Sequence, residues 1–461
     1  MISFQLKAQI MVSLSFKKII RSLILVILIT VLFNQKIEAY TLVTNDKSTL
    51  NFDFELGAGF FAITDDYSGQ NRENVVWEEG YAKFGFSGNY ELIPKEASLY
   101  GGLNSIANGT FGDGDAGGFT NGSERQADLE DAYIGIKNKL NNGAQVDISL
   151  GAQQFVVGSG FLIGSDIFNY GKGFDDDVNR GGTYYLSSRQ AFRNTGILRI
   201  TPVTPLKIEA FYLGSNNPAQ GDSEVAGINV EYSTNDLGTF GFMFLNGLDS
   251  NTSVQEGLFR NRPGLNNFNL RFDGNLGVKN ASFGTEFVYQ ENDGSGVANV
   301  EAYAWYIMAT YKLSDWAWTP KISYRYSFFT GNDPDTIANE EFDPLFYGYT
   351  RFGVWFQGEI GGNYSGPFNA NTAVHHAEID FQPNSKLELS LLAFHFETDE
   401  PGSVASDNYG NELDLVLSWE PTESLYISPA LGFFDPGEGS QIAINNRETS
   451  IYFQLLFNLT Y

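Results

Sequence analysis

The sequence predicts an all-β protein, a transmembrane antiparallel β-barrel of about 18 strands that folds as a single domain after a signal peptide. Three observations predict this class. The chain ends on an alternating segment whose last residue is aromatic, it is rich in aromatic residues and glycine, and its connections are short and long in turn. The last segment alone would also fit an edge strand of a soluble sandwich, but the other two observations favour a membrane barrel.

The C-terminal segment, residues 449–461, alternates with a period of two, which places successive side chains on opposite faces of a strand. One face carries Ile451, Phe453, Leu455, Phe457, Leu459 and Tyr461. The other face carries Tyr452, Gln454, Leu456, Asn458 and Thr460. Such a terminal strand is typical of bacterial outer-membrane barrels. We therefore expect the strand ending at Tyr461 to contact the barrel-assembly machinery, and lipid and lipopolysaccharide to surround the barrel.

The composition fits a barrel with aromatic girdles. The chain has 461 residues with 39 Phe, 24 Tyr, 50 Gly and no Cys, and aromatic residues make up 15% of it. The absence of cysteine excludes disulfides, thiolate metal sites and a cysteine nucleophile. A helical membrane protein would need apolar runs of about 18 residues or more.

The N-terminal segment, residues 1–39, has the pattern of a secretory signal peptide. Lys17, Lys18 and Arg21 precede the apolar run Leu23–Phe33, and the small residue Ala39 comes directly before Tyr40. This run of eleven residues, ten of them apolar, is too short for a comfortable membrane anchor. The expected mature barrel is therefore residues 40–461.

The mature chain is strongly acidic. Removal of residues 1–39 takes away five basic residues and one acidic residue, which leaves 23 basic and 54 acidic residues and a net charge of −31. A nucleic-acid-binding protein would need a basic surface, so this balance argues against nucleic acid as a partner.

Alternating segments of about ten residues, separated by Gly, Asn, Asp and Pro, predict the individual strands. They lie at 50–62, 77–92, 96–107, 128–139, 144–156, 192–202, 205–214, 224–233, 238–247, 266–276, 280–291, 299–312, 317–329, 371–382, 385–397, 409–420, 423–434 and 449–461. Residues 40–49 are expected to form a short leader into the barrel.

Strand parity decides how residues 345–368 are assigned. Residues 349–361 have the pattern of a further strand, but bacterial single-chain barrels have an even number of strands with both ends in the periplasm. We therefore assign 345–368 to a structured external loop, with a short helix as an option. A barrel of about 18 strands has room for a channel unless loops fold inward.

The same alternation predicts which charged residues face the lumen, because a Lys or Arg on the lipid face costs about 2–4 kcal/mol at mid-membrane. The inward basic residues are Lys83, Lys137, Arg193, Arg199, Arg271, Lys321 and Arg325. Acidic residues, among them Glu79, Glu378, Asp380 and Glu412, fall on the same face. Rows of luminal charge select solutes, but such residues also pair across the lumen and brace the wall. Both interpretations stay open.

Neither a metal site, a cofactor nor an active site is expected. The acid-rich stretches 112–115, 175–177 and 332–335 do not match a complete EF-hand loop, and His375 and His376 fall on opposite strand faces. The chain has no G-x-S-x-G, no H-E-x-x-H and no phosphate-binding glycine loop. We therefore do not expect an enzyme.

Several stretches resemble the alginate export family. They are Val146–Phe155 with Gly158–Ile163, Arg325–Ser327 with Gly331–Pro334, Glu341–Gly348, Trp355–Ile360, Glu412–Leu415 and Asp435–Pro436. The resemblance implies an 18-stranded outer-membrane barrel and, for the alginate exporter, an arginine-lined conduit for a polyuronate. The residues that would line it here are Arg193, Arg199, Arg271, Lys321 and Arg325, with Arg189 and Arg351 from loops. Ala152 stands where the family commonly has Arg, which weakens the case for alginate as the cargo.

The sequence therefore predicts a bacterial outer-membrane channel for an anionic or polar solute, such as a polyuronate exopolysaccharide of the alginate type. The alternatives are a general diffusion porin for small nutrients, a plugged barrel with a structural or adhesive role, and an outer-membrane enzyme.

Overall fold

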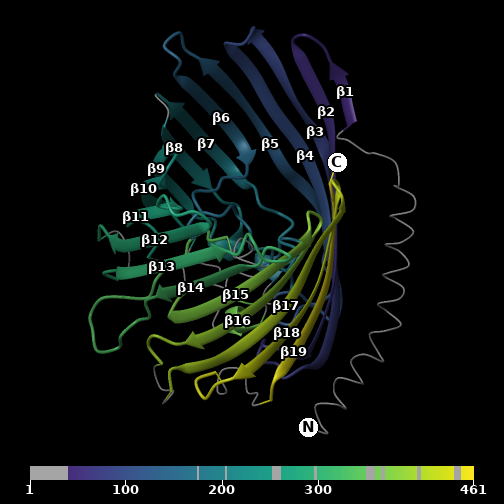
Figure 1. Cartoon of the computed structure of the whole chain (residues 1–461), viewed down its shortest axis with the longest axis vertical. Coiled ribbons are helices and arrows are strands. Elements are labelled where there is room, and N and C mark those ends of the chain that lie inside the picture. The colour runs from purple at the N-terminus through teal and green to yellow at the C-terminus, as the bar shows by residue number, and fades with distance from the viewer. Residues whose placement is uncertain are drawn as a thin grey trace.

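The computed structural model describes residues 40–173, 176–202, 205–251, 261–294, 298–348, 358, 360–364, 369–401, 406–440 and 448–460. Eighteen strands, β2 to β19, pair in chain order, and β19 pairs back with β2, so the sheet closes into a barrel (Figure 1). Every neighbouring pair is antiparallel. In the described part of the chain, no helix has the length and apolar character needed to cross a membrane.

The strands correspond one to one with the eighteen predicted segments. They are β2 Ser48–Asp65, β3 Glu73–Ile93, β4 Ala97–Gly112, β5 Arg125–Lys139, β6 Gln145–Gln153, β7 Phe192–Thr201, β8 Leu206–Gly214, β9 Glu224–Thr234, β10 Gly238–Asp249, β11 Leu265–Gly274, β12 Ala281–Asn292, β13 Glu301–Lys312, β14 Lys321–Phe329, β15 Thr372–Asn384, β16 Leu387–Glu397, β17 Asn408–Thr422, β18 Leu425–Pro436 and β19 Ser450–Thr460. Because β14 pairs directly with β15, no strand from residues 349–361 lies between them.

The prediction of a leader at residues 40–49 is wrong in one respect, because this segment contains the strand β1, Tyr40–Thr44. This strand pairs with residues 49–52 of β2, on the edge that β19 uses further along, at residues 55–63. An unpaired strand edge exposes backbone N–H and C=O groups. The 18-residue β2 extends past its pairing with β19, and β1 pairs with part of the edge that remains.

Two predictions fall outside the described residues. Residues 1–39, the expected signal peptide, are not described, and the role of residue Tyr461 in assembly cannot be placed on the structure, whose last strand ends at Thr460. Both stay predictions.

The outer wall is apolar and the inner wall polar, as the alternation predicts. In β14, Ile322 and Tyr324 are 48% and 47% exposed, whereas Arg325 and Ser327 are buried inside the barrel. This is the reverse of a soluble protein and is the pattern of a barrel in lipid. At the closing seam, Phe60 of β2 packs edge to face on Phe453 of β19, with ring centroids 6.1 Å apart.

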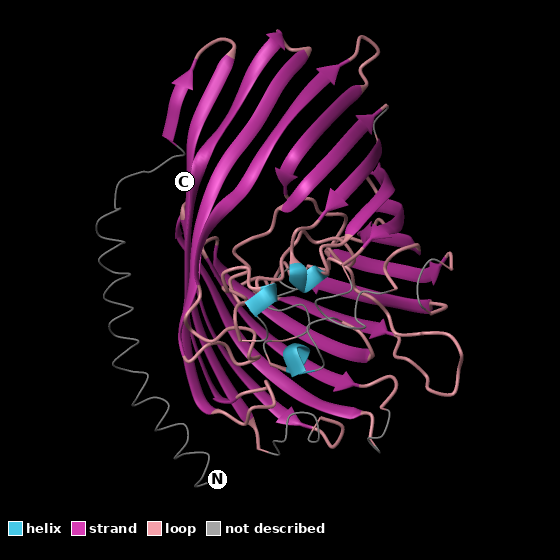
Figure 2. Ribbon diagram, turned by 180° about the vertical axis from the view of Figure 1, so that it is seen from behind, coloured by secondary structure: helices cyan, strands magenta, loops and turns pink. Residues whose placement is uncertain are grey.

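Two long connections fold into the barrel instead of staying outside it (Figure 2). They are the β6–β7 connection, at residues 154–173 and 176–191, and the buried part of the β14–β15 connection, at residues 342–348, 358 and 360–364, called here the first and second inward loops. The first contains the 3-10 helix η1, Asp176–Val178, and the second contains the short helix α2, Gly361–Tyr364. A further 3-10 helix, η2, spans Pro218–Gln220 in the β8–β9 connection.

The inward loops carry much of the buried apolar surface of the protein. The fully buried Phe61 and Trp77 of the wall stack at 5.0 Å, and Tyr185 of the first inward loop packs against both, at 5.1 and 5.0 Å. Aromatic pairs of this kind add about 0.5–1.5 kcal/mol beyond the area that they bury. Much of the hydrophobic core therefore lies inside the lumen, between wall and loops.

The two inward loops also bind each other. Phe346 N donates to Leu162 O at 3.1 Å and Gly164 N donates to Phe346 O at 2.5 Å, which makes a parallel bridge between Ile163 and Phe346. Gly348 N also donates to Gly160 O at 2.7 Å. At Gly164 the backbones approach so closely that a Cβ atom there would lie 2.4 Å from the Cα of Gly348. Only glycine fits at such a contact.

We expect Gly164→Ala to force the two inward loops apart, because the added methyl meets backbone and not a movable side chain. Overpacking of this kind costs about 1–3 kcal/mol. Single-channel recordings of the variant should show larger and more variable currents than wild type. The matched control is Gly284→Ala in β12, where a Cβ meets nothing closer than 3.6 Å. Equal currents in both variants would show that the loop contact does not constrict the lumen.

Candidate functional site

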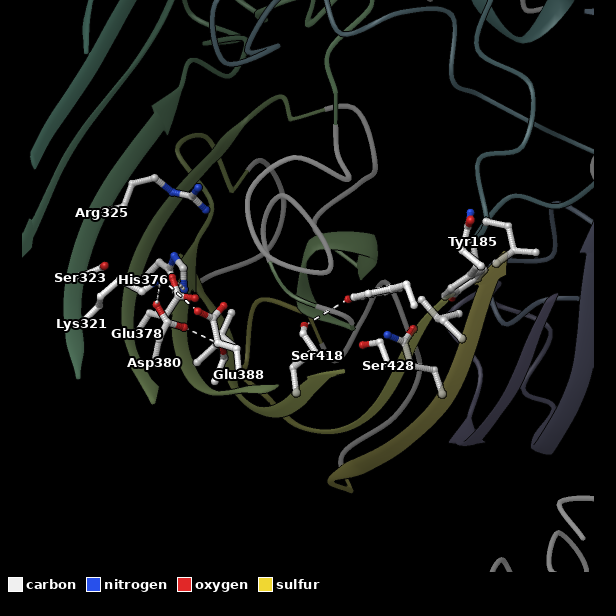
Figure 3. Close-up of a pocket in the computed structure, with 18 of the residues that line it drawn as sticks. Tyr185, Lys321, Ser323, Arg325, His376, Glu378, Asp380, Glu388, Ser418 and Ser428 are labelled. Carbon is white, nitrogen blue, oxygen red and sulfur yellow. Dashed lines mark hydrogen bonds and ion pairs between the residues drawn. The ribbon is translucent and has the colours of Figure 1, made fainter. Parts of the chain in front are cut away.

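The lumen contains a cavity of about 690 Å³ between the inner faces of β12–β19 and the tip of the first inward loop (Figure 3). Tyr185 and Leu186 of that loop border it, and Gly57 of β2 and Tyr81 of β3 complete the wall. Sites for small molecules are typically about 300–1,000 Å³. The cavity is therefore large enough for a sugar-sized solute.

One side of the cavity carries fixed charges from β14, β15 and β16. Lys321 Nζ lies 3.1 Å from Asp380 and 3.4 Å from Glu388, and Ser390 Oγ donates to Asp380 at 2.6 Å. The pairing registers place Lys321 opposite Asp380 and Asp380 opposite Ser390. One ammonium is thus shared by two carboxylates.

A second layer of charge lies further along the same strands. The buried Arg325 is opposite His376 in the β14–β15 register, and Glu378 lies two residues further along β15. The His376 ring stacks on Phe394 with a centroid distance of 4.3 Å and an angle of 7°. Its Nε2 is 3.9 Å from Glu378 Oε2.

The other side of the cavity is lined by hydroxyl and amide groups from β17, β18 and β19. Ser418 Oγ and Tyr426 OH are 3.1 Å apart, and Ser428 lies beyond them on the same strand as Tyr426. Asn458 Nδ2 donates to Tyr81 OH at 3.0 Å. Groups of this type both donate and accept hydrogen bonds, which suits a hydroxylated solute.

A second charged feature, called here the charge ladder, crosses the opposite wall from β5 to β11. Its members alternate in sign: Lys137, Asp147, Arg199, Glu209, Lys207, Glu231 and Arg271. The closest contacts are 2.7 Å between Arg271 and Glu231 and 3.0 Å between Arg199 and Glu209. The ladder has four cations and three carboxylates, and each basic group lies within 4.0 Å of a carboxylate.

Gly241 of β10 makes the end of the ladder possible. Arg271 of β11 and Glu231 of β9 both lie opposite Gly241 in their registers, and the guanidinium reaches across this glycine. A Cβ at position 241 would lie 2.5 Å from Arg271 Cζ. Because position 241 has no side chain, Arg271 Nη2 also reaches Asn229 and donates a hydrogen bond to its Oδ1 at 2.5 Å.

Most of the predicted basic residues do lie on the inner wall, in two groups. Lys137, Arg199 and Arg271 belong to the ladder, while Lys321 and Arg325 border the cavity. A further one, Lys83, lies 3.4 Å from Asp131 and 3.9 Å from Glu55. Of the two interpretations left open by the sequence, the geometry favours cross-lumen pairing for most of this set.

Three predicted residues do not fit the expected row. At the start of β7, Phe192 is fully buried against Phe346 while Arg193 is exposed, because a register shift opposite residues 192–195 breaks the strict alternation. Arg189 is buried and binds Asp128 at 3.1 Å and Glu130 at 3.2 Å, so it anchors its loop instead of meeting a solute. Arg351 lies outside the described residues.

Sequence reasoning missed the role of several wall carboxylates, which hold the inward loops. Glu79 accepts hydrogen bonds from the backbone N–H groups of Tyr185 and Leu186, at 3.2 and 2.9 Å. Glu130 accepts from Gln190 N and Ala191 N, at 2.6 and 2.9 Å. In the same way, Glu412 accepts from Ile360 N, at 2.8 Å, and from Gly361 N. Alternation predicts that Glu79 and Glu412 face inward, but it does not predict this for Glu130, which lies at a register shift in β5, and it cannot identify the loop amides that these acids meet.

Charges in the connections are also used to fix the loops. The pKa of Arg180 in the first inward loop is lowered by burial, and its ion pair with Asp166, at 3.2 Å, opposes that shift. Burial raises the pKa of Asp115 in the β4–β5 connection to about 6, against the effect of hydrogen bonds from Thr120 and Phe119 N.

The charged side chains named above are not arranged as a metal site. Among the described residues, no three His, Asp or Glu side chains are grouped so that they would hold a metal ion.

A closed barrel with an apolar outer wall, inward loops and a polar cavity defines an outer-membrane channel for polar solutes. Solved porins share the fold. The BenF-like porin of Pseudomonas fluorescens Pf-5 is 11% identical, with 89% of this chain and 98% of that chain covered and a TM-score of 0.59. OccK5 (OpdH) of Pseudomonas aeruginosa is 10% identical, with 89% and 98% covered and a TM-score of 0.54. OccK2 (OpdF) of the same organism, in complex with glucuronate, is 13% identical, with 89% and 98% covered and a TM-score of 0.52.

The alginate export family model matches residues 259–450, which confirms the resemblance over this part of the chain. The matched part contains β11 to β18 and therefore the charged side of the cavity. The earlier stretch at 146–163 and most of the charge ladder precede it. No curated protein matches the chain. The partial family match and the fold indicate a barrel of the bacterial outer membrane.

We expect Gly241→Ala to displace the Arg271 guanidinium from Glu231 and so break the charge ladder. A hydrogen bond to a charged group contributes about 1.5–3 kcal/mol, and its loss leaves a luminal carboxylate without one of its cations. The reversal potential in a KCl gradient should shift toward K⁺ preference. Gly284→Ala is again the control, because it adds a luminal methyl with no close contact. An unchanged reversal potential in Gly241→Ala would mean that the ladder does not influence ion passage.

Proposed function

We propose that this barrel passes small hydroxylated solutes of sugar size across the outer membrane by passive diffusion. The observation that carries the proposal is the luminal cavity of about 690 Å³, in which hydroxyl and amide groups face a set of paired charges. Passage requires contacts that are favourable enough for entry and weak enough for release. Side chains such as Ser418, Tyr426 and Asn458 offer contacts of this strength to hydroxyl groups.

The charge arrangement supports a neutral solute over a polyanion. A polyanion would need repeated cationic contacts, but most of the luminal basic groups named above already lie beside one or two carboxylates. Attraction to a passing carboxylate is offset by repulsion from the acid that shares each cation. A neutral polyol is neither attracted by these cations nor repelled by these acids.

The second candidate is an anionic solute of the uronate type, including a polyuronate such as alginate. Two observations favour it. The alginate export family model matches residues 259–450, and a structurally similar porin, OccK2 (OpdF), binds glucuronate in its crystal structure. Arg325 lines the cavity and lies four residues beyond Lys321 on β14. It is the cavity residue that would bind a uronate carboxylate.

The test is a comparison of solutes in proteoliposome swelling. Liposomes containing the protein should swell in glucose and more slowly in glucuronate of nearly equal size, because the acid-flanked cations give an anion no net attraction. Planar bilayers in a KCl gradient give the sign of the preference independently. Faster uptake of glucuronate or of short oligouronates, lost in Arg325→Gln, would favour the second candidate. Neither swelling nor conductance, even with the second inward loop shortened, would instead indicate a plugged structural or adhesive barrel.

A further inference from the structure

We propose that the luminal cavity recognises hydroxylated solutes that carry a protonated amine, with the amine bound between Glu378 and His376 and the hydroxyl groups bound near Ser428. The inference rests on the proposed function and adds the chemical class of the preferred solute. Two features of the cavity support it: the balance of charge in its lining and the buried polar atoms that have no hydrogen-bond partner.

The cavity has a formal negative charge. Three carboxylates line it, those of Glu378, Asp380 and Glu388, against the two cations Lys321 and Arg325. With histidine neutral, the formal charge is −1. Lys321 is held by Asp380 and Glu388, at 3.1 and 3.4 Å, so the Glu378 carboxylate is the acid that this ammonium does not bind. A solute with one positive charge would balance the cavity, whereas a uronate would add to the excess.

In the described part of the chain, His376 Nε2 and Ser428 Oγ are buried polar atoms of the cavity lining with no hydrogen-bond partner; their residues are 4% and 1% exposed. Buried polar groups are nearly always hydrogen-bonded, and each exception calls for an explanation. Both side chains line the cavity, one on each side (Figure 3). A ligand that reaches both sides would satisfy both atoms.

The geometry at Glu378 fits an ammonium group. His376 Nε2 and Glu378 Oε2 are 3.9 Å apart, which is too far for a hydrogen bond between them but suitable for one donor that bonds both. An ammonium has three N–H donors, and neutral imidazole and carboxylate are both acceptors. The stacking of His376 on Phe394 fixes the ring in this orientation.

The opposite side of the cavity fits hydroxyl groups. Ser428 lies near the Ser418–Tyr426 pair, and hydroxyls both donate and accept, so they suit the ring and exocyclic oxygens of a sugar. Arg325 lies opposite His376 and repels an amine, so the Glu378 carboxylate is the group that must attract it. The solute class is therefore an amino sugar or an aminated polyol.

The experiment uses the full-length protein in planar bilayers with four probes: glucosamine, glucose, N-acetylglucosamine and glucuronate. The concentration that half-blocks the single-channel current is measured for each. Glucosamine should block at a roughly tenfold lower concentration than glucose, a difference of about 1.4 kcal/mol. N-acetylglucosamine, which keeps the ring and loses the charge, should behave like glucose, and glucuronate should be the weakest.

Two variants separate the two ends of the site. Glu378→Gln should remove the advantage of glucosamine and leave glucose unchanged, whereas Ser428→Ala should weaken both sugars to a similar extent. Asp53→Asn, at a β2 carboxylate outside both the cavity and the charge ladder, is the matched control and should keep the full preference. Heat-modifiable migration and KCl conductance of each variant report that the barrel is folded.

The outcomes are distinct. If glucose passes and blocks but glucosamine has no advantage, or keeps it in Glu378→Gln, the amine site is overturned while the proposed function stands. If no sugar enters the folded barrel, the proposed function itself fails. A stronger block by glucuronate than by glucosamine would overturn this inference in favour of an anion-binding cavity.

Discussion

The structure depends on one constraint, that hydrocarbon offers no hydrogen-bond partners to a polypeptide backbone. A spanning sheet must therefore close on itself, because any open edge would leave N–H and C=O groups unsatisfied in lipid. The pairing of β19 with β2 meets this requirement. Closure in turn gives the wall two chemically opposite faces, because successive residues of each strand point alternately to lipid and to the lumen. The ion pairs of the ladder and of the cavity accordingly lie on the interior face.

Confinement explains why the luminal charges are arranged in pairs. A cation facing a narrow interior cannot turn toward bulk water as it would on a soluble surface, and its nearest neighbours are the inward residues of adjacent strands. Arg199 and Glu209 on β7 and β8, and Lys321 and Asp380 on β14 and β15, lie directly opposite each other in register. Glu79, Glu130 and Glu412 solve the related problem of the inward loops, whose backbone amides also need acceptors inside the barrel. The acidity of the chain is therefore partly a structural requirement of a filled lumen.

The alternation of the two faces also determines how much of the structure the sequence can predict. Period-two alternation is local, so it gave the eighteen strands to within a few residues and the correct face for Ile322, Tyr324 and Arg325. The alternation carries no information on the register between strands. It therefore could not predict that Gly241 leaves room for Arg271 to reach Glu231 two strands away. It does not extend to Arg189, a loop residue that the family resemblance suggested, and a register shift interrupts it at Arg193. Inward folding of residues 154–173 and 176–191 depends on contacts such as Tyr185 with Phe61 and Trp77, which lie more than 100 residues apart in the chain.

A luminal cation is consequently a poor guide to cargo when it is considered alone. The electrostatic field that a solute meets is set by each cation together with the acids that share it, and at Lys321 two carboxylates outweigh one ammonium. An arginine-lined conduit and a charge-paired lumen have similar basic residues in the sequence and differ in the opposing strands. The family match covers residues 259–450, but the balance of charge and hydroxyl groups around the cavity is a property of this chain. Solute preference should therefore follow that local balance more closely than it follows the family.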